Sequence, residues 1–283
     1  MLPIICITGC SSGFGQHIAL KAAETCEVVA TVRSEKAKAA LLEKAIKLDC
    51  VLDIQLCDVN QQDDVAALAR HINHTYKRLD ILINNAGIAI GGFFEDMTQQ
   101  QVQDVLHTNV LGVMHMTRAM LPLLRESKQA KIINMSSIAG LTGSPLISVY
   151  NASKWALEGF SEALLFELKP FNIAVVLIEP GQYKTQIFDQ NLKFGKDAFE
   201  PSSLYYKWTC AAHNMFKKRL KTRLQDPSKV AQLCVKIIHQ AKPRFRYLIG
   251  KDAWARYLLR RYMPFSWYRR LCHYVIKRTF NHD

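Results

Sequence analysis

Short apolar runs alternate with helical patterns along most of the chain. The runs that we expect to form strands are IICIT (4–8), VVATV (28–32), VLDIQL (51–56), DILIN (80–84), KIINM (131–135), IAVVLI (173–178) and residues 246–249. The longest helical pattern covers about 98–126. Because most runs are apolar throughout instead of alternating with polar residues, both faces must be buried, as in a parallel sheet covered by helices. The regular order of strand and helix predicts an α/β fold with a doubly wound parallel sheet.

The pattern changes after the sixth run. A loop is expected over 181–200, an aromatic helix over about 203–220 and a further helix over about 228–241. With 283 residues, 49% of them hydrophobic, the chain can bury one large core and still carry a C-terminal extension. We therefore expect one α/β domain over residues 1–250 and a helical extension over residues 251–283.

The sequence TGCSSGFG (8–15) follows the first expected strand and opens the first helix. Its glycines let the backbone turn tightly and approach a ligand, while the helix N-terminus offers free N–H groups to a pyrophosphate. Glycine also occurs at such turns for steric reasons alone, but the strand–loop–helix context favours dinucleotide binding and a Rossmann fold. The candidate cofactor-binding residues here are Gly9, Ser11, Ser12, Gly13, Phe14 and Gly15.

The end of the second expected strand carries Arg33 where a carboxylate commonly binds the ribose hydroxyls of NAD. A guanidinium group at this place can pair with the 2′-phosphate of NADP(H). Lys36 and Lys38 add positive charge, whereas Glu35 lies close enough to leave NAD(H) as an alternative. Alternatively, these charged residues are simply the solvated start of the next helix and bind no cofactor. The sequence therefore predicts a preference for NADP(H).

Polar residues also follow the third and fourth expected strands, in CDVN (57–60) and NNAG (84–87). Each sequence alone is a turn signal. Because the carboxyl ends of parallel strands meet at the edge where open α/β sheets bind ligands, the two sequences together indicate a site there. The further candidates for cofactor binding are Asp58, Val59, Asn85, Ala86 and Gly87.

A tyrosine and a lysine lie four positions apart in SVYNASKWAL (148–157), a spacing that places both on one face of a helix. With the motifs above, this pair resembles the motif set of the short-chain dehydrogenases/reductases, in the same order and over about residues 1–250. The motif residues are Thr8, Gly9, Gly13, Gly15, Asp58, Asn84, Asn85, Ala86, Gly87, Asn109, Ser137, Tyr150, Lys154, Pro180 and Gly181. TGCSSG and VVATVR are similar in particular to the NADP-linked 17β-hydroxysteroid and retinol dehydrogenase branch.

The resemblance implies hydride transfer between an alcohol and a carbonyl compound, with Tyr150 as the general acid/base. A phenol with an ordinary pKa of about 10 is a weak acid, and the Lys154 cation one helical turn away favours the phenolate and lowers that pKa. Ser137 is expected to orient the substrate oxygen, with Ser136 as the alternative. Asn109 is expected to support a proton relay from the lysine. Tyr150 and Lys154 are also expected to contact the cofactor.

The sequence PGQYKT follows the sixth strand, and the resemblance implies that its residues close over the nicotinamide carboxamide. The candidates are Pro180, Gly181, Tyr183 and Thr185. The apolar, aromatic segment within 183–222 is where the family builds its substrate lid, although a helix facing the core is the alternative. Such a lid favours a lipophilic substrate, namely a steroid, a retinoid or a lipid-like carbonyl compound.

Eight cysteines are scattered without a CxxC pair, which indicates reduced thiols in a cytosolic protein. The nine histidines show no ligand spacing, so no metal site is expected. The apolar run in MLPIICITG is too short for a signal peptide, and no run of about 18 apolar residues predicts a membrane span. These features together predict a cytoplasmic protein.

The net charge of +13 is concentrated near the C-terminus, because 18 of the 37 Lys and Arg residues follow residue 212, with only 3 of the 24 acidic residues. Pro264 divides the last segment into two helical patterns, and Ser266 is the expected N-cap of the second. Both patterns separate aromatic from basic residues, as in helices that lie on a membrane surface. Docking on the protein or on a second subunit is an alternative. Binding of an acidic partner is a second alternative. Binding of nucleic acid is not expected, because the sequence contains no motif for nucleic-acid recognition.

The sequence as a whole predicts an NADP(H)-dependent oxidoreductase that interconverts an alcohol and a ketone or aldehyde. The alternatives are a non-catalytic NADP(H)-binding scaffold or sensor, and a membrane-surface protein that uses its basic tail. Family members commonly pair through their two longest helices. The resemblance therefore implies a homo-oligomer, either a dimer or a tetramer.

Overall fold

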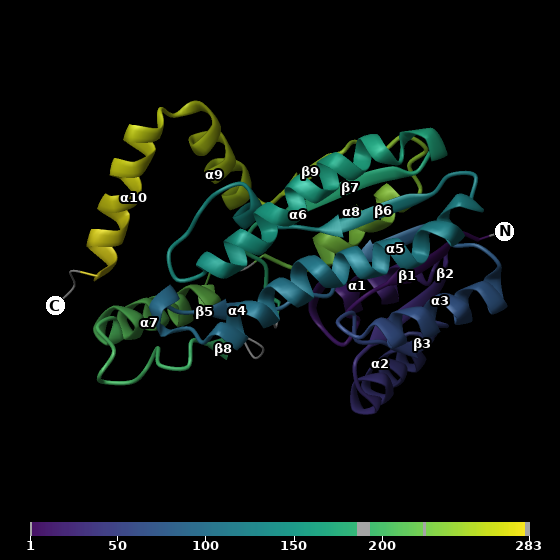
Figure 1. Ribbon diagram of the computed structural model, residues 1–283, viewed down its shortest axis with the longest axis horizontal. Helices are drawn as coiled ribbons and strands as arrows, with labels where there is room; N and C mark the ends of the chain where they lie inside the picture. The colour runs from purple at the N-terminus through teal and green to yellow at the C-terminus, as the bar shows by residue number, and fades with distance from the viewer. Residues whose placement is uncertain (1, 186–192, 223–224, 281–283) are drawn as a thin grey trace.

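The computed structural model describes residues 2–185, 193–222 and 225–280. Within them, seven strands form one parallel sheet with the order β3-β2-β1-β4-β6-β7-β9 (Figure 1). The strands are β1 (Ile4–Ile7), β2 (Glu27–Val32), β3 (Asp53–Leu56), β4 (Ile81–Asn84), β6 (Lys131–Met135), β7 (Ala174–Pro180) and β9 (Arg246–Ile249). The chain builds β2 and β3 on one side of β1 and then returns to build β4 onward on the other. Open α/β sheets bind ligands at such a reversal, beyond the carboxyl ends of the strands.

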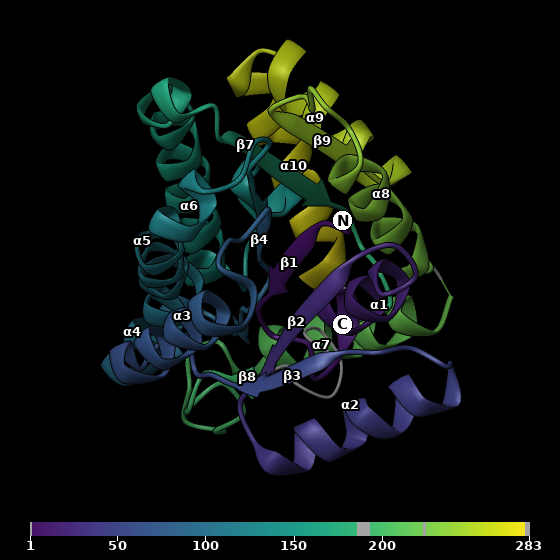
Figure 2. The same cartoon turned by 90° about the vertical axis from the view of Figure 1, so that its right-hand side faces the viewer.

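Helices cover both faces of the sheet (Figure 2). One face packs against α1, α2 and α8, whose Ile18, Leu41 and Val230 are completely buried. The other face packs against α3, α5 and α6, with Ile72 and Met116 completely buried. The helices are α1 (Gly13–Ala22), α2 (Glu35–Lys47), α3 (Gln62–Tyr76), α4 (Gln99–Leu106), α5 (Gly112–Arg125), α6 (Ser148–Glu167), α7 (Tyr206–Thr222), α8 (Ser228–Ile238), α9 (Lys251–Tyr262) and α10 (Phe265–Phe280). The apolar runs of the sequence are thus explained by strands covered on both sides.

The doubly wound parallel sheet is confirmed, and each expected strand lies within two residues of the observed bounds. The expected loop over 181–200 differs from the structure, because it contains β8 (Lys193–Phe194), which pairs in parallel with β5 (Ile90–Gly91). Strands of two residues carry no recognisable hydrophobic pattern, since they form only through pairing with a distant segment. Residues 186–192 of the expected loop lie outside the described residues.

The expected helix over 98–126 is interrupted. It begins with a capping box at α4, in which Thr98 and Gln101 each accept a hydrogen bond from the other's backbone N–H. A π-helical turn over His107–Leu111 then separates α4 from α5. Such turns are frequent at functional sites, and this one contains the candidate residue Asn109.

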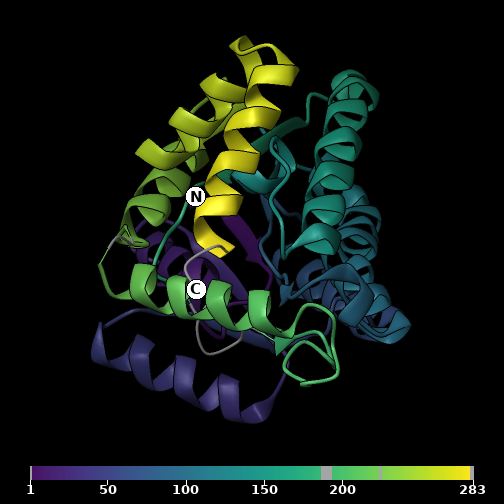
Figure 3. The same ribbon diagram turned by 90° about the vertical axis from the view of Figure 1, so that its left-hand side faces the viewer.

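The C-terminal extension consists of α9 and α10. Ala253 of α9 is completely buried, and α9 lies against β9. Figure 3 shows α10 extending towards α7, which it contacts. Because α10 begins at Phe265, Ser266 lies within its first turn, and the expected N-cap at Ser266 is wrong. None of the described helices combines the length and apolar character that crossing a membrane requires.

Candidate active site

Glycines allow the loop between β1 and α1 to pack tightly against the end of β4. Gly9 has a φ of +71°, and a Cβ atom built on it would lie 2.8 Å from the Cα of Ala86. A Cβ atom on Gly15 would lie 2.4 Å from the side-chain nitrogen of Asn85. Larger residues at these positions would therefore displace the loop or the end of β4. The side chain of Ser12 makes no capping hydrogen bond, so it leaves the first N–H groups of α1 to other acceptors.

Thr8 joins the two strands at the chain reversal. Its Oγ1 accepts hydrogen bonds of 2.9 Å from the backbone N–H groups of both Asn85 and Ala86. The side chain of Asn85 donates in return to the carbonyl oxygens of Thr8 (2.8 Å) and Gly9 (3.1 Å). The glycine loop and the NNAG segment are thus brought together at the carboxyl edge of the sheet.

The candidates after β2 and β3 lie at the same edge. Arg33 directly follows β2, is exposed, and precedes Ser34, the N-cap of α2. Asp58 follows β3 and is partly buried. The side chain of Val59 is buried in the core, where a Cβ atom on Gly112 would lie 2.6 Å from it. A cofactor would therefore meet the backbone of Val59 and not its side chain.

The start of α6 brings three candidates together. Tyr150 lies in the first turn of α6, is buried, and makes a side-chain hydrogen bond with Ser137. Lys154 follows one turn later, and its ammonium group lies 5.7 Å from the centre of the Tyr150 ring. The same ammonium group donates a hydrogen bond of 2.8 Å to the carbonyl oxygen of Met135, at the end of β6. Hydroxyl, phenol and ammonium groups thus converge beyond the end of β6.

Burial dominates the pKa values of this group. Burial raises the pKa of Tyr150 to about 12, and the hydrogen bond with Ser137 opposes this rise. Burial lowers the pKa of Lys154 to about 8, and the negative charge of Glu158 opposes this fall. The predicted lowering of the Tyr150 pKa is therefore wrong for the chain without a cofactor. That prediction rested on the charge of Lys154 and did not include the burial of the phenol.

Asn109 connects the loop after β4 with α6. It is completely buried, and its side chain accepts a hydrogen bond of 2.9 Å from the N–H of Ile88 and donates one of 2.9 Å to the carbonyl of the same residue. It also donates to the hydroxyl of Ser153 at 3.0 Å. A Cβ atom on Gly87 would lie 3.2 Å from the side-chain oxygen of Asn109. The π-helical turn thus places this amide next to the residue that precedes Lys154.

The segment after β7 lies beside the glycine loop. Tyr183 is buried, and its ring meets the ring of Phe14 edge-on at a centroid distance of 5.7 Å. The hydroxyl of Tyr183 has no hydrogen-bond partner among the residues that the structure describes. A Cβ atom on Gly13 would lie 3.6 Å from the Cβ of Thr185. These contacts bring the PGQYKT segment to the start of α1.

Helix α9 holds the turn that follows β7. Pro180 is the last residue of β7, and the backbone N–H of Gln182 donates a hydrogen bond of 2.7 Å to the Asp252 carboxylate of α9. A Cβ atom on Gly181 would lie 2.3 Å from the same carboxylate. Gly181 is therefore required at this position for the close approach of α9.

Arg256 of α9 holds a second loop of the site. Its guanidinium group donates hydrogen bonds of 2.7 Å to the hydroxyl of Thr142 and 2.6 Å to that of Ser144. Both hydroxyls belong to the loop that leads from Ser137 to Tyr150. The contact of the C-terminal extension with the site was not predicted, because nothing in the sequence links residues more than 100 positions apart.

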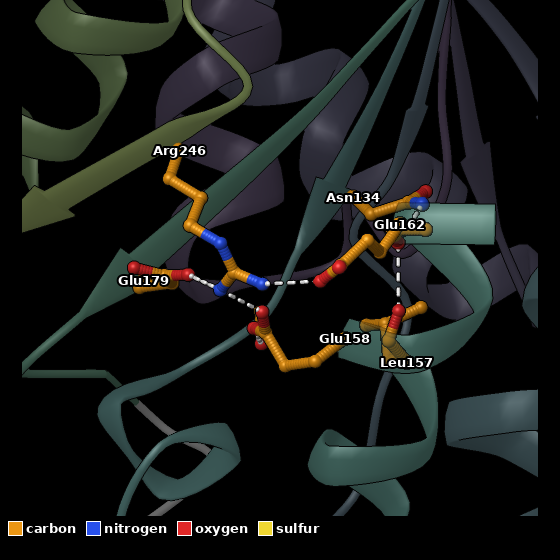
Figure 4. Close-up of polar contacts among 8 residues, drawn as sticks. Asn134, Leu157, Glu158, Glu162, Glu179 and Arg246 are labelled. Atoms are coloured by element: carbon orange, nitrogen blue, oxygen red, sulfur yellow. Dashed lines mark hydrogen bonds and ion pairs between the residues drawn. The ribbon is translucent and has the colours of Figure 1, made fainter. Parts of the chain in front are cut away.

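A buried cluster of charged residues lies behind the site, where α6, β7 and β9 meet (Figure 4). Arg246 of β9 donates hydrogen bonds to Glu158 of α6 and Glu179 of β7, which are 6% and 2% exposed. Ser136, the alternative substrate-orienting serine, donates to Glu158. Sequence reasoning missed this cluster. The available signals were a carboxylate four residues after Lys154 and charged residues within otherwise apolar strands.

Aromatic side chains gather near the start of α7, within the expected lid. The ring of Phe93 stacks on that of Tyr205 at 4.3 Å and lies 6.2 Å from that of Trp208. Trp208 is 46% exposed. This segment is therefore an aromatic surface in part, and not only a helix facing the core. Residues 186–192 of the expected lid lie outside the described residues.

The site fits a nicotinamide dinucleotide. The glycine loop has no space for side chains towards β4, and the first N–H groups of α1 are left free by Ser12. The buried hydroxyl of Tyr183 lacks a partner among the described residues. Within the same part of the chain, no group of three or more His, Cys, Asp or Glu residues could hold a metal ion. The loop could hold the pyrophosphate, and Tyr150 and Lys154 could hold the nicotinamide riboside.

Comparison with known proteins identifies the family. The sequence profile described as short chain dehydrogenase matches residues 3–194. An uncharacterised oxidoreductase of Bacillus subtilis (strain 168) is 38% identical, over 93% of this chain and 94% of its own length. The 17-beta-hydroxysteroid dehydrogenase type 1 of Homo sapiens is 32% identical, over 86% of this chain and 76% of its own. A short-chain dehydrogenase/reductase structure from Burkholderia phymatum, in complex with NAD, has a TM-score of 0.79 and 27% identity, over 91% of this chain and 92% of its own.

The profile match covers the six strands from β1 to β7 that belong to the main sheet, together with the glycine loop and the Tyr150–Lys154 pair. The relatives extend the likeness over most of the chain. The resemblance that the sequence motifs indicated, including that to the 17β-hydroxysteroid dehydrogenase branch, is confirmed. The chain is an oxidoreductase and belongs to the short-chain dehydrogenase/reductase family.

Proposed function

We propose that this protein is an NADP(H)-preferring oxidoreductase that interconverts a lipophilic alcohol and the corresponding ketone or aldehyde. The observation that carries this proposal is the convergence of the Ser137, Tyr150 and Lys154 side chains beyond the end of β6. A bound nicotinamide cofactor supplies or accepts the hydride. The chain's own side chains supply the proton transfer and the orientation of the substrate.

Each side chain has a role that follows from its chemistry. Tyr150 gives or takes the hydroxyl proton of the substrate at its phenolic oxygen. Ser137 hydrogen-bonds the substrate oxygen and fixes its direction. The charge of Lys154 favours the phenolate, which matters because burial raises the pKa of Tyr150 to about 12 despite the hydrogen bond with Ser137. Asn109 fixes the π-helical turn against α6 and supports the proton relay.

The cofactor preference rests on Arg33. Its exposed guanidinium group lies at the end of β2, and no ion-pair partner for it occurs within the described parts of the chain. A free guanidinium group at this place suits a 2′-phosphate, which a carboxylate would repel. Since the related structure from Burkholderia phymatum contains NAD, the preference must be measured with both cofactors.

The lipophilic substrate rests on the aromatic surface formed by Phe93, Tyr205 and Trp208. Large apolar side chains near a site favour apolar ligands, because burial of both surfaces releases water. The name of the human relative identifies a steroid as its substrate class. Steroid, retinoid and lipid-like carbonyl compounds are therefore the classes to screen.

A cofactor-oxidation screen tests the proposal. The chain is assayed with NADPH and NADH in parallel against steroid, retinoid and long-chain acyl carbonyl compounds, with short polar carbonyl compounds as the matched control. We expect NADPH oxidation with at least one lipophilic class and weaker oxidation with the polar controls. Absence of oxidation with every compound would favour the alternative of a non-catalytic NADP(H)-binding scaffold or sensor.

The C-terminal extension supports a second proposal, contact with an anionic membrane surface. Its large exposed side chains are Trp254, Leu258, Leu259, Tyr262, Phe265, Trp267, Leu271, Tyr274 and Val275. Arg261, Arg269, Arg270 and Lys277 are exposed, and within residues 251–280 Asp252 is the sole acidic residue. Exposed aromatic and basic residues on one pair of helices suit the interface of a membrane, where each cation contributes about 1 kcal/mol.

Charge reversal in the full chain tests this contact. Arg269→Glu with Arg270→Glu should abolish co-sedimentation with vesicles that contain phosphatidylserine. Lys128→Glu with Lys229→Glu, which reverses two exposed charges elsewhere, should leave it unchanged. Recovery of the unaltered chain in the supernatant at low salt would contradict the proposal and leave docking on a protein as the role of the exposed face.

A homo-oligomer is proposed on the evidence of α6. Trp155 and Phe166 are 48% and 70% exposed, and their spacing of eleven residues places them on one face of this long helix. Pairing of α6 with a second copy would bury both rings. Trp155→Lys should convert a dimer or tetramer into monomers in sedimentation velocity experiments, whereas Val51→Lys, at a more exposed position outside α6, should not. A monomeric unaltered chain would contradict the proposal.

A further inference from the structure

Two buried carboxylates share one arginine behind the site (Figure 4). Arg246 donates hydrogen bonds to Glu158 and, at 2.7 Å, to Glu179, and a longer one of 3.4 Å to Glu162. Glu158 and Glu179 are almost completely buried, whereas the side chain of Glu162 is 59% exposed. Two negative charges on one guanidinium group in a buried site repel each other. A further proton is therefore expected in this cluster.

We assign this proton to Glu179. Burial and the nearby charge of Glu158 together raise the pKa of Glu179 to about 7, against the opposing effect of Arg246. Burial also raises the pKa of Glu158, but hydrogen bonds from Ser136, Arg246 and Glu179 favour its ionised form. The cluster is thus arranged so that Glu179 donates a hydrogen bond and Glu158 carries the negative charge.

Glu158 also holds the turn that carries Ser137. The hydroxyl of Ser136 donates to the Glu158 carboxylate. On the other side of the turn, a Cβ atom on Gly140 would lie 2.9 Å from Cγ of Glu158 and 3.0 Å from Oγ of Ser136. The turn from Ser136 to Gly140 is therefore packed directly against this carboxylate. A movement of Glu158 would move the serine hydroxyl that faces Tyr150.

Glu158 is also the charged group that acts on Lys154 from within the chain. It lies four residues after Lys154 on α6, and its negative charge opposes the lowering of the Lys154 pKa by burial. The other groups described at Lys154 are the Tyr150 ring on α6 and the Met135 carbonyl on β6. Neither of these carries a formal charge while the phenol is protonated, so Glu158 is the negatively charged residue that acts on the ammonium group.

We propose that Glu158 is a positioning residue for proton transfer, whose carboxylate both fixes the turn that carries Ser137 and supports the positive charge of Lys154. This inference rests on the proposed function for its catalytic consequence, but not for its effect on Lys154. The matched control is Glu162, which lies on the same helix one turn further, contacts the same arginine, and faces solvent.

The test is the titration of Lys154 in the full chain without added cofactor. The chain is labelled with 13C-lysine, and the Lys154 resonance is assigned by its loss in Lys154→Arg. In Glu158→Gln the side chain keeps its size but loses its charge, so the midpoint of the Lys154 titration should fall by about one pH unit. In Glu162→Gln it should not move. An unchanged midpoint in Glu158→Gln, or an equal shift in both variants, would overturn the proposal.

The pH profile of kcat gives the catalytic readout. With a lower Lys154 pKa, the lysine loses its charge at a lower pH, so the alkaline limb of the kcat profile should move to lower pH in Glu158→Gln. KM should change less than kcat, because the carboxylate does not contact the substrate. Glu158→Asp retains the charge but holds it further from Lys154, so its alkaline limb should lie between those of Glu158→Gln and the unaltered chain. A profile identical to that of the unaltered chain would overturn the proposal.

The proposed oxidoreductase activity and the proposed role of Glu158 can be contradicted independently of each other. A shifted Lys154 titration in a chain that oxidises no cofactor would support the role of Glu158 and contradict the proposed activity. Turnover together with an unshifted Lys154 titration in Glu158→Gln would support the proposed activity and contradict the role of Glu158. If Glu158→Gln does not fold, as judged by thermal unfolding, Glu158→Asp replaces it. Its shorter side chain should lower the Lys154 midpoint relative to the unaltered chain, and an unchanged midpoint would overturn the proposal.

Discussion

The ammonium group of Lys154 donates a hydrogen bond of 2.8 Å to the carbonyl oxygen of Met135, the last residue of β6. This bond fixes the lysine of α6 to the edge of the sheet at which the strands end. The strand that carries Met135 continues directly into Ser136 and Ser137. One helix and one strand end are thus sufficient to bring the ammonium, phenol and serine hydroxyl groups together.

Gly9→Ala should damage both stability and cofactor binding. The positive φ of Gly9 is unfavourable for alanine, and the added Cβ would lie 2.8 Å from the Cα of Ala86. We expect the free energy of unfolding to fall by about 2 kcal/mol or more in urea titrations. Gly159→Ala is the control, because its Cβ meets nothing within 4 Å in a helix, and it should raise stability by about 0.5–1 kcal/mol. Equal effects of the two variants would contradict the account of the loop.

Arg33→Ala should weaken the binding of NADPH without affecting NADH. Loss of one charge-assisted contact with the 2′-phosphate corresponds to about a tenfold increase in Kd. The binding of both cofactors is measured by fluorescence titration, with Arg118→Ala as a control for the loss of an exposed charge elsewhere. Tighter binding of NADH than of NADPH by the unaltered chain would contradict the role of Arg33.

Arg256→Ala should lower kcat/KM although the residue lies in the C-terminal extension. The variant loses two hydrogen bonds, to Thr142 and Ser144, which hold the loop before Tyr150. Hydrogen bonds from a charged group contribute about 1.5–3 kcal/mol each to stability, so thermal unfolding should also occur at a lower temperature. Arg261→Ala, at an exposed position of the same helix, should change neither quantity. Unchanged activity in Arg256→Ala would show that α9 does not support the site.

The cluster behind the site predicts a pH dependence of stability. The pKa of Glu179 is raised from 4.5 to about 7, so between these values the folded chain holds a proton that the unfolded chain releases. The contribution of this group to stability is therefore present at pH 4.5 and is lost as the pH rises towards 7. Glu179→Gln should make the free energy of unfolding less dependent on pH in this window, whereas Glu162→Gln should not. Identical slopes in all three chains would contradict the assignment of the proton.

Most of the fold could be predicted because its signals are local. Strands buried on both faces are apolar throughout, and the glycine loop occurs where the first strand passes into a helix. The Tyr150–Lys154 pair could be predicted because residues four positions apart share a helical face. The two-residue strands β5 and β8 could not, because their pairing joins segments about 100 residues apart.

The charged surroundings of the site could not be predicted for the same reason. Glu158, Glu179 and Arg246 come from three different elements, and their proximity depends on the order of β7 and β9 in the sheet. The sequence also does not show how deeply Tyr150 and Lys154 are buried, and burial is the main influence on their pKa values. The four-residue spacing was enough to identify Tyr150 and Lys154. Their pKa values could be judged only from the folded structure.

The most direct test of the central claim is the turnover of Tyr150→Phe with a substrate found in the carbonyl screen. Removal of the phenolic hydroxyl should lower kcat by about 10²–10⁴-fold while the chain still binds the cofactor, because general acid–base catalysis contributes about that factor. Tyr274→Phe, which removes an exposed hydroxyl in α10, should retain full activity. If Tyr150→Phe turns over as fast as the unaltered chain, Tyr150 is not the acid/base and the proposed mechanism is wrong.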